Sequence, residues 1–169
     1  MPRSSLADIR ALPDPLMSYN WDLFVPSVPS GGDFRSLTVK CQNVNIPGVS
    51  VEDVPVTLHG VTVKYAGREM YTNQFTASFL ETRDMTTRDV IRGWIEYCRN
   101  SAANTGTYKT QYSTTAILAL YDDAGNVVRS LNIYGCFPQQ LDEPSLDGSG
   151  SQPVLYSVTF NFDFTAEVS

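Results

Sequence analysis

The sequence has a single histidine, His59, and this scarcity excludes several classes of enzyme. A Ser-His-Asp type triad needs a histidine as its base. Metal centres built from several histidines are equally impossible within one chain. Because glycine follows His59 and apolar residues flank it, we expect it to lie in a hairpin turn rather than in a catalytic site.

Cysteine is also scarce. The chain contains Cys41, Cys98 and Cys136, an odd number without Cys-x-x-Cys or Cys/His spacing. This pattern predicts reduced, buried thiols rather than a zinc site or a disulfide framework. Residues 122–126, "DDAGN", hold two aspartates but lack the alternating ligands and closing glutamate of a calcium loop. We therefore expect no cofactor and no metal.

Long apolar runs are missing as well. No segment approaches the roughly 20 residues of a membrane span, so no membrane association is expected. The first residues, "MPRSSLADIRALPDPLMS", lack the continuous apolar segment of a secretory signal. This favours a chain that is made and used in the cytoplasm or released by lysis.

Positive charge is nearly absent from the C-terminal part. Arg129 is the only Lys or Arg in residues 122–169, and the net charge of -6 arises from the acidic residues there. Because an acidic surface repels the phosphate backbone, sequence-specific DNA binding is not expected. Neither the adjacent acids Asp142 and Glu143 nor the glycines of "LDGSGSQ" form a catalytic or phosphate-binding pattern, so we predict that the protein is not an enzyme.

What the chain does contain is strand periodicity. We predict strands over 34–44, with Leu37, Val39 and Cys41 on one face, over 71–81, and over 114–135 as a hairpin with its turn at "DDAGN". Residues 46–67 form an extended hairpin or loop, in which Pro55 indicates an edge or a bulge. Residues 137–153 form a loop. The proline-rich residues 1–17 form an N-terminal arm, and residues 18–169 a single domain.

One segment has helical spacing instead. From Thr86 to Ala103 an apolar stripe of Val90, Ile91, Trp94, Ile95 and Cys98 predicts an amphipathic helix that packs on the sheet. Thr86 with Asp89 resembles a capping box. The outward face of this helix carries Arg88, Arg92, Glu96 and Arg99, with Arg92 and Glu96 at pairing distance.

The last segment, "VLYSVTFNFDFTAE" at 154–167, alternates most clearly. One face carries Val154, Tyr156, Val158, Phe160, Phe162 and Phe164, which we expect in the core. The other face has hydroxyls, an amide and one carboxylate, namely Ser157, Thr159, Asn161 and Asp163. A single long strand with one buried and one wet face is expected.

The order of these elements resembles a known family. The stretches "YNWDLFVP", "IPGVSVEDVPVTLHGVTVKYAGREM", "FTASFLETRDMTTRDVIRGWIEYCRN", "AILALYDDAGNVVRSLNIYGCFPQQLDE" and "YSVTFNFDF" together resemble the tail tube protein of contractile-tailed bacteriophages, and the pattern D-x-T-T-R-D-x-I-x-x-W contributes most. Related proteins form the inner tubes of bacterial contractile injection systems and some baseplate hub rings, and these remain alternatives.

The resemblance implies an antiparallel β-sandwich or barrel-like subunit with one flanking helix. Six such subunits form a ring, their strands close into one ring-wide β-barrel, and rings stack into a hollow tube. Expected partners are other copies of the chain, a sheath protein, baseplate and tail-terminator proteins, and a tape measure protein and DNA in the lumen without specific binding. The implied location is the virion tail, assembled in the host cytoplasm.

Within this picture the sequence assigns three surfaces. Ser157, Thr159, Asn161 and Asp163 face the lumen, because a wall without cations gives phosphates nothing to hold. The outward helix face contacts the sheath. An apolar segment interrupted by prolines and glycine contacts the adjacent ring, with Pro47, Val51, Val54, Pro55, Leu58 and His59. The competing hypothesis from a different class is a β-sandwich module that binds carbohydrate or protein.

Overall fold

The computed structural model describes residue 6 and residues 10–45 and 47–168. The chain is mainly β, as predicted, with antiparallel pairing throughout. The strands are β1 (Trp21–Phe24), β2 (Cys41–Val44), β3 (Val49–Leu58), β4 (Val61–Tyr71), β5 (Gln74–Leu80), β6 (Arg99–Asn100), β7 (Thr105–Gly106), β8 (Thr114–Tyr121), β9 (Val127–Asp142), β10 (Leu155–Asn161) and β11 (Phe164–Val168). The helices are α2 (Phe34–Lys40), α3 (Thr86–Cys98) and α4 (Lys109–Tyr112).

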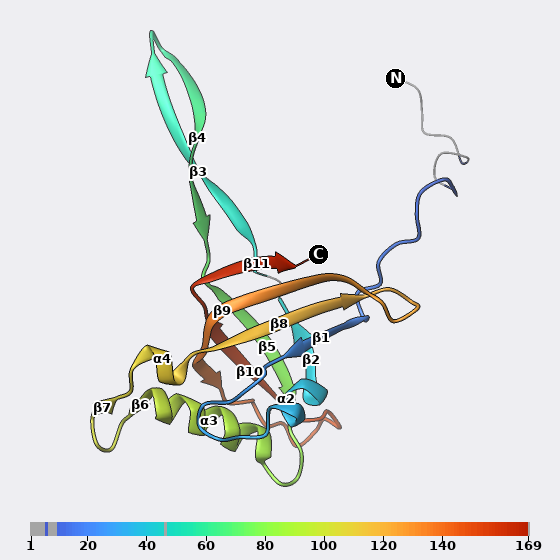
Figure 1. Cartoon of the computed structure of the whole chain (residues 1–169), viewed down its shortest axis with the longest axis vertical. Coiled ribbons are helices and arrows are strands. Elements are labelled where there is room, and N and C mark those ends of the chain that lie inside the picture. Colours follow the sequence, from blue (N-terminus) through green and yellow to red (C-terminus); the bar gives the residue numbers. More distant parts are fainter. Residues whose placement is uncertain (1–5, 7–9, 46, 169) are drawn as a thin grey trace.

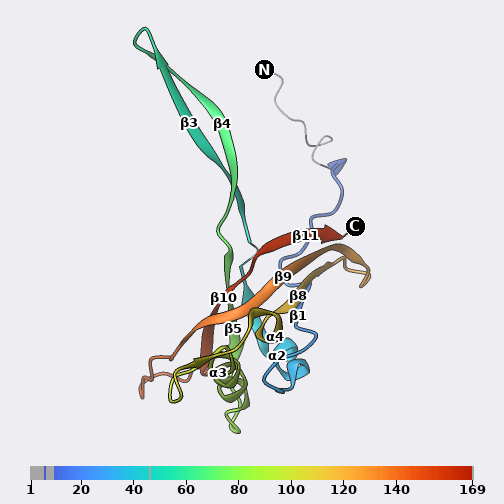
Figure 2. The same ribbon diagram turned by 60° about the vertical axis from the view of Figure 1, so that its left-hand side comes forward.

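A seven-stranded sheet forms the body of the subunit, with strand order β1-β8-β9-β10-β5-β2 and with β11 also paired to β9 (Figure 1). The first half of β9 pairs with β8 and β11, and its second half pairs with β10. The two halves of the sheet run in different directions, and α3 lies at the end opposite the long β3–β4 hairpin (Figures 1 and 2). The hairpin projects far from this body, so it makes a surface of its own.

The terminal strand predicted over 154–167 is interrupted. β10 ends at Asn161, and β11 begins at Phe164 and pairs with a different part of β9. Opposite the break, Gly135 has a φ of 67°, and a Cβ there would collide with the Asp163 carboxylate. The single long strand was therefore a wrong prediction, and Phe164 lies outside the core, stacked on Tyr134 with ring centroids 4.7 Å apart.

The core contains the side chains that the alternation of the strands predicted to be buried. Phe75, Ala77 and Phe79 of β5 pack with Val158 and Phe160 of β10, and Phe162 joins them. Phe75 and Phe160 stack with centroids 5.1 Å apart. From α3, Ile91 and Trp94 are completely buried, whereas Val90, Ile95 and Cys98 are half-buried against the same cluster. The amphipathic stripe of the helix is thus confirmed.

The first half of the strand predicted over 34–44 is instead the short helix α2. Asp33 caps its N-terminus, with a carboxylate oxygen that accepts a hydrogen bond from the Arg35 N–H at 3.0 Å. Leu37 is 2% exposed and Val39 is 79% exposed, so these residues do not share a face. The alternating apolar residues of this segment favour a strand, whereas Asp33 favours a helix start. The structure has the helix, which the Asp33 cap stabilises.

α3 begins where the sequence predicted, but its end and its cap differ. It ends at Cys98 rather than Ala103, and Met85, in the left-handed region with a φ of 54°, occupies the N-cap without a side-chain bond. The capping box of Thr86 and Asp89 is therefore not formed. Instead, Glu81 caps the helix from outside, because its carboxylate accepts the N–H groups of Thr87 at 3.2 Å and Arg88 at 2.9 Å.

This cap leads to a first prediction. Glu81→Ala leaves two N–H groups at the start of α3 without their partner, and we expect it to lower the free energy of unfolding by about 1 to 2 kcal/mol, the usual effect of losing a cap. Asp89→Ala is the matched control and should change it by less than about 0.5 kcal/mol, since Asp89 is exposed. Thermal unfolding of both variants checks this. A larger loss for Asp89→Ala would contradict the assignment.

The β8–β9 turn is formed as predicted. The Asp122 carboxylate accepts the N–H groups of Ala124 at 2.9 Å and Asn126 at 2.7 Å, and bonds from Asn126 lower the pKa of Asp122. β9 continues to Asp142, so the loop predicted over 137–153 begins only after that residue. Residues 137–142 are part of the sheet.

Candidate functional site

A polar surface extends across β5, β10 and the second half of β9. Directly opposed residues of antiparallel strands project to the same face. The opposed residues are Ser157 with Ser78 and Asp142, Thr159 with Thr76 and Gln140, and Asn161 with Gln74 and the apolar Phe137. Gln139 joins them, since Gln74 Nε2 donates to its Oε1 at 2.8 Å. We call this surface the polar wall; its members are Gln74, Thr76, Ser78, Gln139, Gln140, Asp142, Ser157, Thr159 and Asn161.

The polar wall carries one ionisable group, Asp142, and no cation. Lys40 and Lys64, the lysines of two neighbouring segments, lie away from the polar wall. Lys40 ends α2 and donates to the hydroxyls of Thr82 and Thr86 at 2.8 and 2.6 Å. Lys64 pairs with Asp53 on the hairpin at 2.5 Å. The polarity predicted for one strand therefore extends to its neighbours, with Phe137 opposite Asn161 as an apolar exception.

Asp163 does not share the wall with the other three predicted lumen residues. It lies in the bend between β10 and β11, where its N–H bonds to the Tyr134 carbonyl at 2.9 Å. Its carboxylate forms an ion pair with Lys109. Sequence alternation placed Asp163 on this face because it assumed an unbroken strand.

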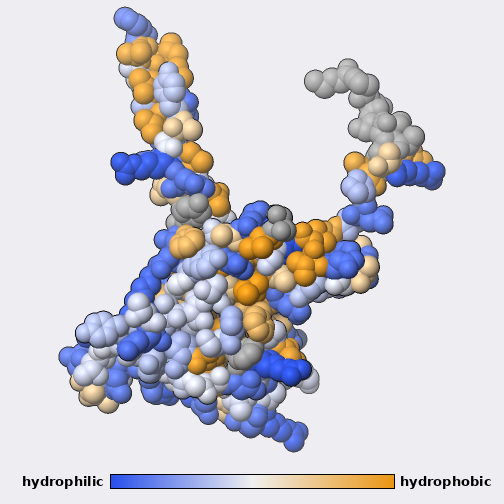
Figure 3. Space-filling view, viewed as in Figure 1, coloured by the Kyte–Doolittle hydropathy of each residue, from blue (hydrophilic) through white to orange (hydrophobic). Residues whose placement is uncertain are grey.

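The β3–β4 hairpin is the second surface, and it is amphipathic. Register places Val54 opposite Tyr65, Val56 opposite Val63 and Leu58 opposite Val61, so these side chains share one face. Each of them is between 38% and 67% exposed, and hydrophobic residues are visible along the hairpin in Figure 3. We call this the apolar hairpin face. Such an extended apolar surface normally contacts another molecule.

The opposite hairpin face is polar. It carries the Asp53–Lys64 ion pair and Thr57, whose hydroxyl lies 2.9 Å from that of Thr62. Pro55, paired with Lys64, belongs to this polar face. The ribbon therefore has one face suited to water and one suited to burial.

Five of the predicted ring-contact residues lie in β3 or at the hairpin turn, and Pro47 lies just before β3. Val54 and Leu58 belong to the apolar hairpin face. His59, with a φ of 50°, forms the turn. Ile46, the first residue of the predicted segment, lies outside the described residues. Sequence analysis did not assign Val56, Val61, Val63 and Tyr65, although the alternation in "VPVTLHGVTVKY" was the signal for them.

The outward face of α3 carries charges that are already paired. Arg88 Nη2 lies 2.9 Å from Glu143 Oε1, and this carboxylate raises the pKa of the arginine. Arg92 and Glu96 form the predicted pair at 3.1 Å. Arg99 lies in β6 rather than in the helix, so the four residues do not form one helical surface.

All three cysteines are free thiols, as predicted, but only Cys136 is fully buried. Burial raises the pKa of Cys41 to about 12 and that of Cys98 to about 11. Their nucleophilic thiolate forms are therefore scarce at neutral pH.

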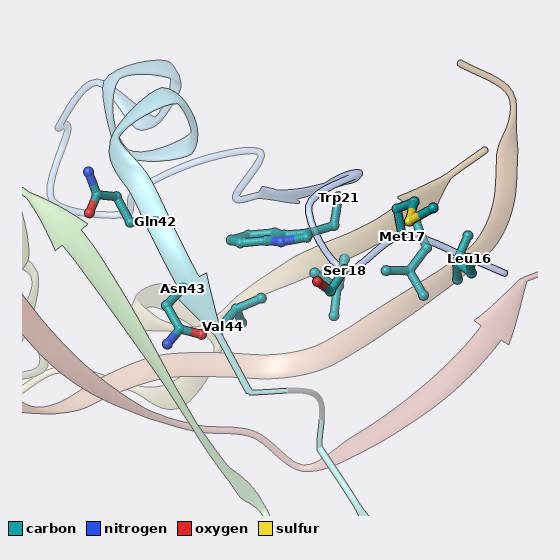
Figure 4. Close-up of a pocket in the computed structure, with 9 residues that line it drawn as sticks. Leu16, Met17, Ser18, Trp21, Gln42, Asn43 and Val44 are labelled. Carbon is teal, nitrogen blue, oxygen red and sulfur yellow. The ribbon is translucent and has the colours of Figure 1, made fainter. Parts of the chain in front are cut away.

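A cavity of about 460 Å³ lies where the arm meets the body (Figure 4). Leu16 and Met17 of the arm, Ser18 directly after it and Trp21 of β1 line one side, opposite Asn43 and Val44 of β2. Leu118 and Leu120 of β8 also line it. Most of its lining residues are apolar, and they come from both the arm and the sheet. We therefore interpret the cavity as part of the packing between arm and sheet.

The family of this chain follows from comparison with known proteins. The family model described as phage tail tube protein matches residues 22–165. The chain belongs to the phage tail tube protein family. The matched residues include the polar wall, the hairpin and α3. No curated protein matches the sequence, and among the described residues no helix is long and apolar enough to span a membrane.

Solved structures confirm the fold of this tail tube protein. A chain of the PVC extracellular contractile injection system, from its sheath–tube complex in the extended state, has a TM-score of 0.66 at 18% identity, with 99% of each chain covered. A chain from the PVC sheath/tube terminator has a TM-score of 0.70 at 19% identity, covering 94% of this chain and 100% of that one. A chain from the tube-terminating cap of the anti-feeding prophage has a TM-score of 0.68 at 18% identity, with 99% of each covered.

Proposed function

We propose that this chain is the repeating subunit of a phage tail tube, in which hexameric rings stack into a hollow conduit for DNA inside a contractile sheath. The observation that carries the proposal is the polar wall, a surface of hydroxyls, amides and one carboxylate without a cation. A lumen that DNA slides through favours such a surface, since lysine and arginine bind phosphates strongly.

Sheet topology supports ring formation. β1 and β2 lie at the two ends of the strand order, and within the described part of the chain no further strand pairs on the outer side of either one. Unpaired edges invite pairing with another chain. A head-to-tail contact that closes by rotation pairs them around a ring and makes one continuous barrel. The wall strands β9, β10 and β5 would then line the lumen.

Several partners follow from this role. The related PVC and anti-feeding prophage structures are sheath–tube, terminator, cap and baseplate assemblies. By analogy, this chain would contact a sheath, a baseplate and a terminator, and a tape measure protein would fill the lumen before DNA passes. We propose that the sheath contacts Arg92 and Glu96 of α3, together with the nearby Arg88 and Arg99.

The solved structures also favour a second candidate, the inner tube of an extracellular contractile injection system. The same ring and wall would serve it. Electron microscopy of the purified protein tests both candidates: hexameric rings or tubes are expected, and a protein that remains monomeric at high concentration would contradict both.

The lumen assignment makes its own prediction. Thr159→Lys combined with Asn161→Lys adds cations to the polar wall, and assembly should remain nearly intact because both positions are already polar and partly exposed. At low salt, tubes of this variant should bind short duplex DNA with an affinity at least about tenfold higher than that of native tubes. They should release the DNA as the salt concentration rises. DNA held in the lumen should resist nuclease.

The control adds the same charge elsewhere. Ser101→Lys with Ala102→Lys modifies the exposed β6–β7 turn. DNA bound there should be digested by nuclease. If the wall variant binds DNA that is equally nuclease-sensitive, the polar wall lies on the outside of the tube and the lumen assignment is wrong.

A further inference from the structure

A second apolar surface lies at the end of the subunit opposite the hairpin tip. Here the loop after β5 and the segment 143–154 enclose a cavity of about 420 Å³. We call it the loop pocket; its apolar members are Met85, Pro144, Leu146, Pro153, Val154 and Tyr156. Leu146 is 80% exposed and Met85 43% exposed. In Figure 1 the β5–α3 connection lies at the bottom of the molecule and the hairpin at the top.

The two carboxylates at this pocket already have partners within the subunit. Glu143 pairs with Arg88 at 2.9 Å, and Glu81 accepts N–H groups at the start of α3. Arg83 lies at the rim, where a long side chain can keep its charge in water. An apolar partner could therefore cover the pocket without leaving a buried charge unpaired, which would be costly.

We propose that the loop pocket receives the apolar hairpin face of a second copy of this chain in the adjacent ring. The proposal rests on the ring stacking proposed above and identifies the surface that receives the hairpin. Because donor and receptor lie at opposite ends of the subunit, every copy can use both in a head-to-tail stack. It would also give the segment 143–154 a role.

The composition and size of the hairpin fit this contact. The apolar hairpin face has no ionisable group except the Tyr65 hydroxyl, so it suits a pocket whose two carboxylates have partners and whose arginine, Arg83, is exposed. The apolar hairpin face offers six side chains, and the loop pocket has six apolar lining residues. The N-terminal arm, with exposed Leu12 and Leu16, is the competing occupant.

Disulfide trapping tests the pairing directly. A variant with Leu58→Cys and Leu146→Cys should form covalent multimers under mild oxidation when assembled as tubes, because each copy donates one thiol and receives another. Dilute unassembled subunits should not cross-link. The native thiols interfere little, as their pKa values are raised by burial. The matched control, Thr57→Cys with Leu146→Cys, places the thiol on the opposite hairpin face and should cross-link much less.

A second measurement separates this inference from the proposed function. Leu146→Asp should leave subunits folded and rings intact, but it should raise the protein concentration needed for tube growth by about tenfold or more. Ser145→Asp, the matched control, should leave that concentration unchanged. Normal tube growth by Leu146→Asp together with no cross-link from the cysteine pair would overturn the loop pocket while ring stacking stands. Cross-linking of Leu12→Cys to Leu146→Cys instead would assign the pocket to the arm. A native protein that forms no rings would overturn the proposed function itself.

Discussion

Trp94→Ala is expected to lower the free energy of unfolding by about 3 to 5 kcal/mol, the usual cost of removing a large aromatic side chain from a core. Trp94 has 0% exposed area, and its ring centroid lies 6.2 Å from that of Phe160. Its Nε1 donates to the Tyr112 carbonyl at 2.7 Å, which ties α3 to α4. The substitution therefore leaves a cavity between helix and sheet and removes a buried hydrogen bond.

Thermal unfolding should show this as a decrease in Tm of roughly 6 to 20 °C for a chain of this size. Trp94→Phe keeps most of the buried area but leaves the Tyr112 carbonyl without its donor, so its cost should be about 1 to 3 kcal/mol. Tyr97→Ala, an exposed aromatic of the same helix, should change stability by less than about 0.5 kcal/mol. An unchanged Tm for Trp94→Ala would mean that α3 does not pack on the sheet.

Strand alternation predicted the core well because it is a local property. In β5 and β10 every second side chain is buried, and the buried set is readable from the sequence alone. The helical stripe around Trp94 was equally readable, since few amphipathic segments of that spacing fit a strand. The polar half of β10 was predicted for the same reason.

Features that depend on distant residues could not be predicted in this way. Beside the end of β10, Gly135 has no Cβ, and this leaves room for the Asp163 carboxylate. The cap of α3 comes from Glu81, which lies outside the helix. The capping pattern in the sequence involves only the first turn, and it therefore pointed to Asp89. The full polar wall needed the order β9-β10-β5, which no single strand contains.

α2 shows a different failure, in which two local signals compete. The apolar residues Leu37, Val39 and Cys41 alternate as in a strand, whereas Asp33 offers a helix cap after two glycines. A helix of 7 residues has too few turns for its own periodicity to be visible. The cap is the stronger signal here because it satisfies a backbone N–H that a helix start otherwise leaves unpaired.

The hairpin prediction has the largest expected effect on assembly. Val56→Asp with Val63→Asp places two carboxylates on the apolar hairpin face, and we expect tube formation to be lost at concentrations where the native chain assembles. Burying an unpaired carboxylate in a contact is strongly unfavourable. The subunit itself should remain folded, because side chains 49–70 of the hairpin are exposed in the isolated chain. Electron microscopy and sedimentation measure the first effect, and circular dichroism the second.

Thr57→Asp with Thr62→Asp is the matched control, since it adds the same charge to the neighbouring cross-strand pair but on the polar hairpin face. Opposed like charges should destabilise the β3–β4 hairpin to a similar extent in the two variants. A difference in tube formation between the variants therefore reports which hairpin face is buried in the contact. Tubes should form from the threonine variant and not from the valine variant. Long tubes from the valine variant would show that rings stack through another surface. Equal loss from both would mean that the hairpin tolerates no added charge, and the apolar hairpin face would no longer be distinguished as the contact.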